Sequence, residues 1–230
     1  MRLFCFPYAG GGSSTFRPWL KSLSNFIEIC AAQLPGREAR IGEQPYDDLL
    51  TMVDALSNAI APHLTKPFAF FGHSMGAMIS FELARALRRK LNVEPVHLFV
   101  SGRRAPQTPR TREITYKLAE PEFIAELRRL NGTPPEVLDN PELMQLMIPL
   151  LRADFSVCQT YQYVSEPPLS CPITVFGGLE DDTTRQELDA WRELTSATCT
   201  VRMAPGDHFF LHTAQPQILR IVEQQLRQFA

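Results

Sequence analysis

The sequence predicts a single α/β domain with a mostly parallel sheet and helices on both of its faces. Three observations support this prediction. The chain has 230 residues, which suits one domain with a sizeable core. Short apolar runs alternate with longer segments of helical periodicity, as in a parallel sheet with crossover helices. Several of the short runs are continuously apolar, which is typical of strands that are covered on both faces.

The candidate elements follow one another in a regular order. The predicted strands are Leu3–Phe6, Ile27–Gln33, Phe68–Phe71, Val96–Ser101, Ile173–Phe176 and Thr200–Met203. Three longer segments carry apolar residues at helical spacing and are predicted helices; they are Tyr46–His63, Met75–Lys90 and Pro216–Phe229.

The segment from 105 to 170 breaks the alternation, because it contains helical patterns but no convincing buried strand. From Leu143 to Leu151 the apolar residues run around the whole helix, whereas a surface helix has only an apolar stripe. Two interpretations stay open: a helix buried under a long insertion, or a lid, at about 105–165, whose inner face lines an apolar ligand channel. Pro149 is expected to kink or end this helix.

Composition excludes several classes of protein. Apolar residues are 44% and charged residues 21%, which excludes a disordered chain. The net charge is −2, so no global field would draw nucleic acid or a membrane surface. Five cysteines without CxxC spacing argue against a disulfide framework or a zinc site. No signal peptide precedes the first apolar run, and no run approaches the roughly 18 residues of a spanning helix, so a cytoplasmic location is expected.

A strand, a tight turn and a helix surround the most informative motif. Residues 68–76 read FAFFGHSMG, in which a buried strand is followed directly by G-x-S-x-G and then by a helix. In this context the motif predicts a nucleophile elbow, which holds Ser74 in a strained conformation with its hydroxyl at the top of the sheet. The helix N-terminus behind Ser74 favours a developing oxyanion.

A serine nucleophile needs a histidine base, and the chain has five histidines. The chain order of this architecture is serine, acid, histidine. His208 lies in the loop PGDHFFL after the last predicted strand, at the same sheet edge as Ser74, and is therefore the predicted base. His212 is the alternative. His73 lies inside the elbow and cannot reach the hydroxyl of its neighbour, and His97 lies in a predicted buried strand.

The orienting acid should follow a strand between Ser74 and His208. The strand ITVF is followed by GGLEDD, so the acid is one of Glu180, Asp181 and Asp182. Spacing alone does not choose among three adjacent carboxylates.

Two backbone N–H groups are expected to form the oxyanion hole. One belongs to Met75, the residue after the nucleophile. The other comes from the loop FPYAGGGSS after the first strand, where Ala9 or Gly10 is the candidate. This loop is neither GxGxxG nor a P-loop, so a nucleotide-binding function is not favoured.

Seven segments, spread over nearly the whole chain, resemble the type II (external, editing) thioesterases of polyketide and nonribosomal peptide synthesis. The segments are FPYAGG at 6–11, FRPW at 16–19, QLPGRE at 33–38, FGHSMGA at 71–77, LRADF at 151–155, GGLEDD at 177–182 and GDHFFL at 206–211. GHSMG is shared by many hydrolases, whereas FPYAGG, LPGRE and RADF together are much more specific to this family.

The resemblance implies an α/β-hydrolase fold with a helical lid after the strand that ends near Ser101. It implies hydrolysis of acyl thioesters on the phosphopantetheine arm of acyl or peptidyl carrier proteins, without a metal or a cofactor of the enzyme's own. In this family's pattern Ser74 matches the nucleophile, His208 the base and Asp181 the acid. Ala9 and Met75 match the oxyanion donors.

Contacts with the acyl group and with the carrier are expected at the lid and its borders. If the insertion is a lid, its candidate substrate contacts are Met144, Met147 and Phe155. A basic rim would favour docking of an acidic carrier, and two clusters of basic residues are candidates. The first contains Arg103, Arg104, Arg110 and Arg112, and the second contains Arg85, Arg88, Arg89 and Lys90. Cations at a helix C-terminus also explain the second cluster.

Three other functions are compatible with parts of this pattern. A general esterase or an acyl-CoA thioesterase would use the same three residues without docking a carrier. An acyltransferase would exclude water from the acyl-serine. A non-catalytic binding module would be expected to lose a member of the triad. A monomer that contacts its carriers transiently is the expected state.

Overall fold

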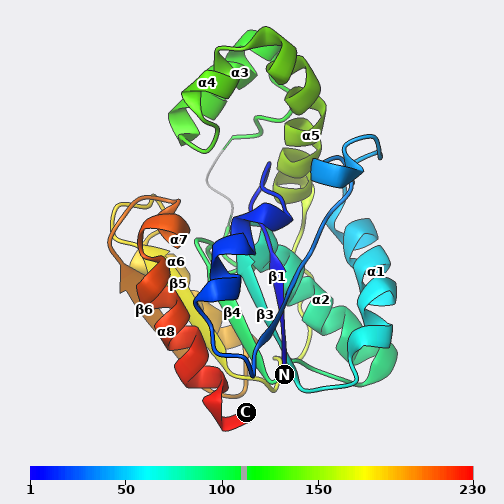
Figure 1. Cartoon of the computed structure of the whole chain (residues 1–230), viewed down its shortest axis with the longest axis vertical. Coiled ribbons are helices and arrows are strands. Elements are labelled where there is room, and N and C mark those ends of the chain that lie inside the picture. Colours follow the sequence, from blue (N-terminus) through cyan, green and yellow to red (C-terminus); the bar gives the residue numbers. More distant parts are fainter. Residues whose placement is uncertain (110–112, 230) are drawn as a thin grey trace.

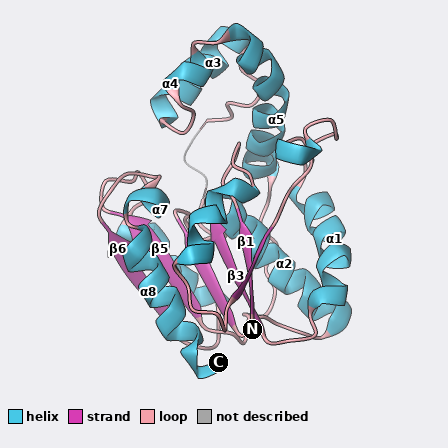
Figure 2. Ribbon diagram, viewed as in Figure 1, coloured by secondary structure: helices cyan, strands magenta, loops and turns pink. Residues whose placement is uncertain are grey.

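The computed structural model describes residues 1–109 and 113–229, and within them a six-stranded parallel sheet forms the centre of the protein (Figures 1 and 2). The spatial order is β2-β1-β3-β4-β5-β6, and every neighbouring pair is parallel. The strands are β1 (Arg2–Phe6), β2 (Glu28–Ala31), β3 (Phe68–His73), β4 (His97–Ser101), β5 (Ile173–Gly178) and β6 (Cys199–Ala204). The predicted fold class is confirmed, and each predicted strand is present with small differences at its ends.

Helices cover both faces of this sheet (Figure 1). One face carries α1 (Leu49–Ile60), α2 (Met75–Leu91) and α6 (Arg185–Asp189), and the other carries the 3-10 helix η1 (Ser13–Lys21), α7 (Phe210–Thr213) and α8 (Gln215–Leu226). Four short 3-10 turns complete this part of the described chain: η2 (Glu38–Arg40), η3 (Ala61–His63), η4 (Ala190–Leu194) and η5 (Arg227–Phe229). None of the helices in the described ranges has the length and apolar character that crossing a bilayer requires.

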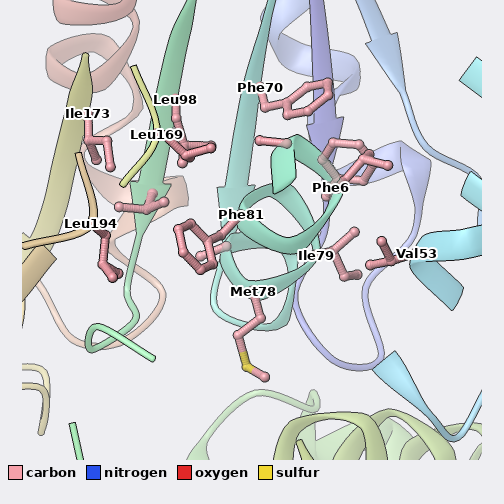
Figure 3. Packing of buried hydrophobic residues seen from close by; sticks show 14 of the residues in the cluster. Phe6, Val53, Phe70, Met78, Ile79, Phe81, Leu98, Leu169, Ile173 and Leu194 are labelled. Atoms are coloured by element: carbon pink, nitrogen blue, oxygen red, sulfur yellow. The ribbon is translucent and has the colours of Figure 1, made fainter. Parts of the chain in front are cut away.

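Alternation along the strands builds a core on each face. Phe4 and Phe6 of β1 pack toward α1 and α2, whereas Leu3 and Cys5 pack toward η1 and α8. Successive side chains of a strand point to opposite faces, so continuous apolar runs supply both cores. Figure 3 shows Ile79 of α2 beside Val53 of α1, and both belong to the core on the face that α1 and α2 cover. Burying one such side chain contributes about 1.5–3 kcal/mol.

Capping residues define where two of the helices begin. The Asp48 side chain accepts a hydrogen bond from the N–H of Thr51, so α1 begins at Leu49 rather than at the predicted Tyr46. Asn140 caps the helix that begins at Pro141 in the same way, by accepting from the N–H groups of the two residues that follow this proline.

Three helices between β4 and β5 stand above the carboxyl ends of the strands (Figure 1). They are α3 (Glu120–Leu130), α4 (Pro135–Leu138) and α5 (Pro141–Thr160), and we call them the lid. The lid has its own apolar cluster of buried residues, which are Phe123, Leu127, Leu138, Met144, Ile148 and Leu151. Farther along α5, Val157 belongs to the core beneath α2. Thus α5 connects the lid to the body of the protein.

Of the two expected effects of Pro149, a kink or the end of the helix, the second is wrong, because α5 continues to Thr160. Ile148, Leu150 and Leu151 around the proline are buried, and their packing offsets the roughly 3 kcal/mol that an interior proline costs. The interpretation of a helix buried on all sides is also wrong for the first half of α5. Leu146 is 55% exposed on its outer face.

Candidate active site

Ser74 lies between the end of β3 and the start of α2, in the turn that the motif predicts. Its backbone has φ 54 and ψ −110, a strained conformation for a residue with a side chain. The Ser74 N–H donates to the carbonyl of Ser101 at 2.7 Å, which ties the turn to the end of β4. The turn leaves the hydroxyl free to face the loop after β6.

Gly76 allows α2 to pass directly against β1. A Cβ atom at this position would lie 2.0 Å from the carbonyl oxygen of Phe6, so no other residue fits without moving the strand or the helix. The close crossing places the first turn of α2 beside the loop that follows β1.

Ser74, His208 and Asp181 form a continuous hydrogen-bonded relay. The distance between Ser74 Oγ and His208 Nε2 is 3.0 Å, and that between His208 Nδ1 and Asp181 Oδ2 is also 3.0 Å. A carboxylate can only accept, so Nδ1 carries the proton and Nε2 accepts from the serine hydroxyl. The Asp181 side chain is 3% exposed, so water does not compete with His208 for this carboxylate.

The loops after β5 and β6 decide which of the candidate residues meet. Asp181 is the carboxylate that accepts from His208, while Glu180 and Asp182 line the cavity nearby. His212, the alternative base, points elsewhere, because its Nε2 lies 3.2 Å from the hydroxyl of Tyr8.

His73 has a place in the site that sequence reasoning missed. Its Nε2 lies 2.9 Å from the carbonyl oxygen of His208, and its Nδ1 lies 2.8 Å from Ser101 Oγ. Because the carbonyl can only accept, Nε2 carries the proton and the serine hydroxyl donates to Nδ1. Burial lowers the pKa of His73 well below its usual value, and the nearby His208 adds to this effect. The neutral ring therefore holds the backbone of His208 rather than taking part in proton transfer.

Of the two residues expected to supply the oxyanion donors, Met75 directly follows Ser74, and Ala9 lines the same cavity as Ser74. The N–H of Met75 is the first of α2 and has no acceptor within the helix. In the loop after β1, the Gly10 N–H donates to Asp154 Oδ2 at 2.7 Å, so it is already engaged. Ala9, which lines the cavity beside Ser74, is therefore the remaining candidate of the two.

A cavity of about 840 Å³ lies between the relay and the lid. This volume is within the range of small-molecule sites. Its lining includes Ser74 and His208 on one side and the lid residues Leu127, Leu151 and Phe155 on the other. A site of this kind can hold an acyl chain with its carbonyl at the serine.

Of the predicted substrate contacts in the lid, the described cavity lining includes Phe155 but neither Met144 nor Met147. Met144 is 3% exposed inside the lid's own cluster, and Met147 packs against the same cluster. Apolar character alone could not separate these two roles, because both the lid core and the cavity require it.

The two basic clusters have different surroundings. Arg103 and Arg104 line the cavity, and Arg110 and Arg112 lie outside the described residues. The second cluster does not form a free basic surface, because its members are paired with carboxylates. The pairs are Arg85 with Glu82 and Glu166, Arg88 with Glu94 and Glu166, Arg89 with Glu166, and Lys90 with Asp54.

Comparison with known proteins gives concordant results. The family model of the thioesterase domain matches residues 1–226. The gramicidin S biosynthesis protein GrsT of Aneurinibacillus migulanus is 52% identical over 228 residues, which are 99% of this chain and 89% of that protein.

Two solved structures are similar over almost the whole chain. RedJ, a thioesterase of the prodiginine pathway of Streptomyces coelicolor, has a TM-score of 0.91 and 38% identity, covering 98% of this chain and 85% of its own. YbtT, a type II thioesterase of the yersiniabactin NRPS/PKS pathway, has a TM-score of 0.90 and 31% identity, covering 100% of this chain and 94% of its own.

Proposed function

This chain belongs to the thioesterase domain family, among the type II thioesterases of nonribosomal peptide and polyketide synthesis, and we propose that it releases acyl groups from the phosphopantetheine arm of carrier proteins. The resemblance that the sequence motifs indicate is thereby confirmed. The proposed role is editing, in which misprimed or stalled acyl groups are removed and the carrier thiol becomes free again.

The observation that carries this proposal is the relay from Ser74 through His208 to Asp181 at the wall of a cavity that the lid also lines. A serine activated by an oriented histidine performs acyl transfer. A cavity with an apolar lid side accepts the acyl chain, and the arm enters from the carrier. The chemistry uses side chains, backbone N–H groups and water.

In the first half-reaction, His208 Nε2 takes the proton of Ser74 as Oγ attacks the thioester carbonyl carbon. The N–H groups of Met75 and Ala9 donate to the oxyanion, and the start of α2 favours its charge. The carbon–sulfur bond then breaks, the sulfur takes the proton from His208, and an acyl-serine remains.

In the second half-reaction, a water molecule gives a proton to His208 Nε2 and attacks the acyl-serine carbonyl. The bond to Ser74 Oγ breaks, and the oxygen recovers the proton from the imidazolium. Asp181 stabilises the charged ring in both halves and keeps Nδ1 protonated. The products are the carboxylic acid and the regenerated enzyme.

Two further features support the expected state of the enzyme. All members of the relay come from one chain, so a monomer that binds carriers transiently is sufficient. All five cysteines are free, as is usual in a reducing compartment. This agrees with a cytoplasmic location.

Intact mass measurement of an acyl-loaded carrier protein, before and after incubation with the enzyme, tests the proposal. Loss of the acyl mass with retention of the arm is expected, at a higher rate than on the matching acyl-CoA. Ser74→Ala should abolish turnover and leave binding of the acyl-carrier largely intact. Rapid hydrolysis of acyl-CoA or simple esters with an untouched carrier would instead identify a general esterase.

A further inference from the structure

A buried ion pair joins α5 of the lid to the segment that follows β2. Arg37, in the segment QLPGRE, places Nη2 at 2.8 Å from Asp154 Oδ1 and Nη1 at 3.0 Å from Oδ2. Asp154 lies in α5, in the segment LRADF. The exposure of the two residues is 3% and 0%. Burial raises the pKa of the Asp154 carboxyl, and the adjacent guanidinium opposes this rise.

The same two side chains hold both sides of the loop that carries Ala9. Asp154 Oδ2 accepts from the Gly10 N–H at 2.7 Å, and Arg37 Nη1 donates to the Gly11 carbonyl at 2.9 Å. Gly10 has a φ of +78, and a Cβ atom there would lie 2.7 Å from Leu151 Cδ2. The loop is thus clamped against α5 by charge and by close contact, directly after the expected oxyanion donor.

An ion pair buried to this degree contributes little to the free energy of folding, so stability alone does not explain why it joins these two segments. Removing two charges from water carries a large desolvation penalty, and well-packed apolar residues often give equal or higher stability. A bidentate pair does, however, fix the positions of the groups bonded to it. Here the pair fixes the Ala9–Gly10 peptide through the Gly10 N–H and the Gly11–Gly12 peptide through the Gly11 carbonyl.

We propose that Asp154 and Arg37 are positioning residues that hold the Ala9 N–H where the oxyanion develops and so couple the seating of α5 to catalysis. This inference rests on the proposed function. It predicts that loss of the pair weakens binding of the tetrahedral transition state much more than binding of the substrate. Loss of one oxyanion donor typically lowers kcat by about 10²–10³, so a displaced donor should lower it by roughly 10- to 100-fold.

A second buried ion pair in the same molecule supplies a matched control. Glu82 and Arg85 of α2 have side chains that are 4% and 3% exposed, and Glu82 accepts from the Tyr161 hydroxyl at 2.6 Å. This pair also joins the body to the chain that leaves α5, but it does not bond to the loop after β1. Glu82→Gln should therefore disturb packing without a specific effect on the transition state.

The test measures kcat and KM on an acyl-N-acetylcysteamine thioester for the wild type, Asp154→Asn, Arg37→Lys and Glu82→Gln. It also measures affinity for two analogues of the same acyl chain, a trifluoromethyl ketone that forms a tetrahedral adduct and a thioether that does not. In Asp154→Asn and Arg37→Lys we expect kcat and ketone affinity to fall by at least 10-fold, with KM and thioether affinity within about 3-fold. Glu82→Gln should keep the wild-type ratio of ketone to thioether affinity.

The double variant Arg37→Met with Asp154→Leu removes both buried charges, and it keeps the test decisive if a single variant fails to fold. It should fold and still lose kcat. Wild-type kcat in a folded double variant, or equal losses of ketone and thioether affinity in all variants, would show that the pair is structural only. A wild-type enzyme that turns over neither this thioester nor the acyl-loaded carrier protein would instead refute the proposed function.

Discussion

At the scale of single residues, one carboxylate among three neighbours accepts the hydrogen bond of the histidine. If Asp181 orients His208, Asp181→Asn should lower kcat by about 10⁴, because an amide favours the wrong imidazole tautomer. Steady-state hydrolysis of an acyl thioester measures this effect. Asp47→Asn is the matched control, since it makes the same substitution at an exposed position outside the cavity lining, and it should stay near the wild-type rate. An equal loss in both variants would contradict the assignment.

The choice of Asp181 illustrates what sequence could not supply at this scale. The pattern GGLEDD places three carboxylates after β5, and the fold of the loop selects the one that meets His208. His73 is a similar case, since its ring supports the backbone of a residue 135 positions away. Arg37 and Asp154 are separated by 117 positions. No local pattern relates partners at such distances.

A buried histidine makes stability depend on pH. His97 is 2% exposed. Its Nε2 lies 2.8 Å from Thr174 Oγ1, and its Nδ1 has no hydrogen-bond partner among the described residues. Burial lowers the pKa of His97 from 6.5 to about 4. The unfolded chain therefore binds more protons between these values. Stability should fall as pH drops from about 6.5 to about 4, by up to about 3 kcal/mol for this residue.

Urea unfolding at pH 7 and pH 4.5 checks this prediction. His97→Gln keeps a polar group near Thr174 but does not titrate, so its loss of stability between the two pH values should be smaller than that of the wild type. His63→Gln, at an exposed position, should follow the wild-type profile. Identical pH dependence in the His97 variant and the wild type would exclude this source of acid sensitivity.

At the scale of elements, the close crossing of α2 and β1 is the most constrained packing near the site. Gly76→Ala should destabilise the protein by at least about 3 kcal/mol, because the new Cβ meets the Phe6 carbonyl and β1 is held on both sides. Gly42→Ala introduces the same methyl group with nothing within 4 Å and should change stability by less than about 0.5 kcal/mol. Thermal unfolding of the two variants compares them, and similar melting temperatures would contradict the prediction.

The predictability of the elements follows from their surroundings. Strands covered on both faces are mostly apolar, so Phe68–Phe71 and its neighbouring strands could be predicted from the sequence, while the extension of β3 to His73 could not. Helix α5 was harder to predict, because a proline in its interior signals an end while tertiary packing maintains the helix. The lid cluster and the cavity both select apolar residues, which is why Met144 and Phe155 looked alike in the sequence.

At the scale of the whole molecule, Arg103 and Arg104 line the cavity, and under the proposed function we expect the arm of the carrier to pass them. Reversal of both charges, as Arg103→Glu with Arg104→Glu, should weaken binding of an acidic carrier by roughly 10-fold or more. This loss of affinity should be larger at lower salt concentration, where charges are screened less. Arg220→Glu is the control, because Arg220 is exposed on α8, on the opposite side of the sheet from α2. Titration with the carrier measures the affinity of both variants. Equal affinities of the double variant and the Arg220 variant would show that Arg103 and Arg104 are not part of the docking surface.

The distribution of the relay along the chain has a consequence for protein synthesis. Ser74 and His208 are 134 positions apart, and His208 follows β6, which pairs with β5 alone at the edge of the sheet. Domains begin to form from the N-terminus as the chain leaves the ribosome. The serine therefore emerges long before its base, and under the proposed function we expect a nascent chain that ends before His208 to be inert toward loaded carriers. The chain must extend through His208 before the relay can assemble.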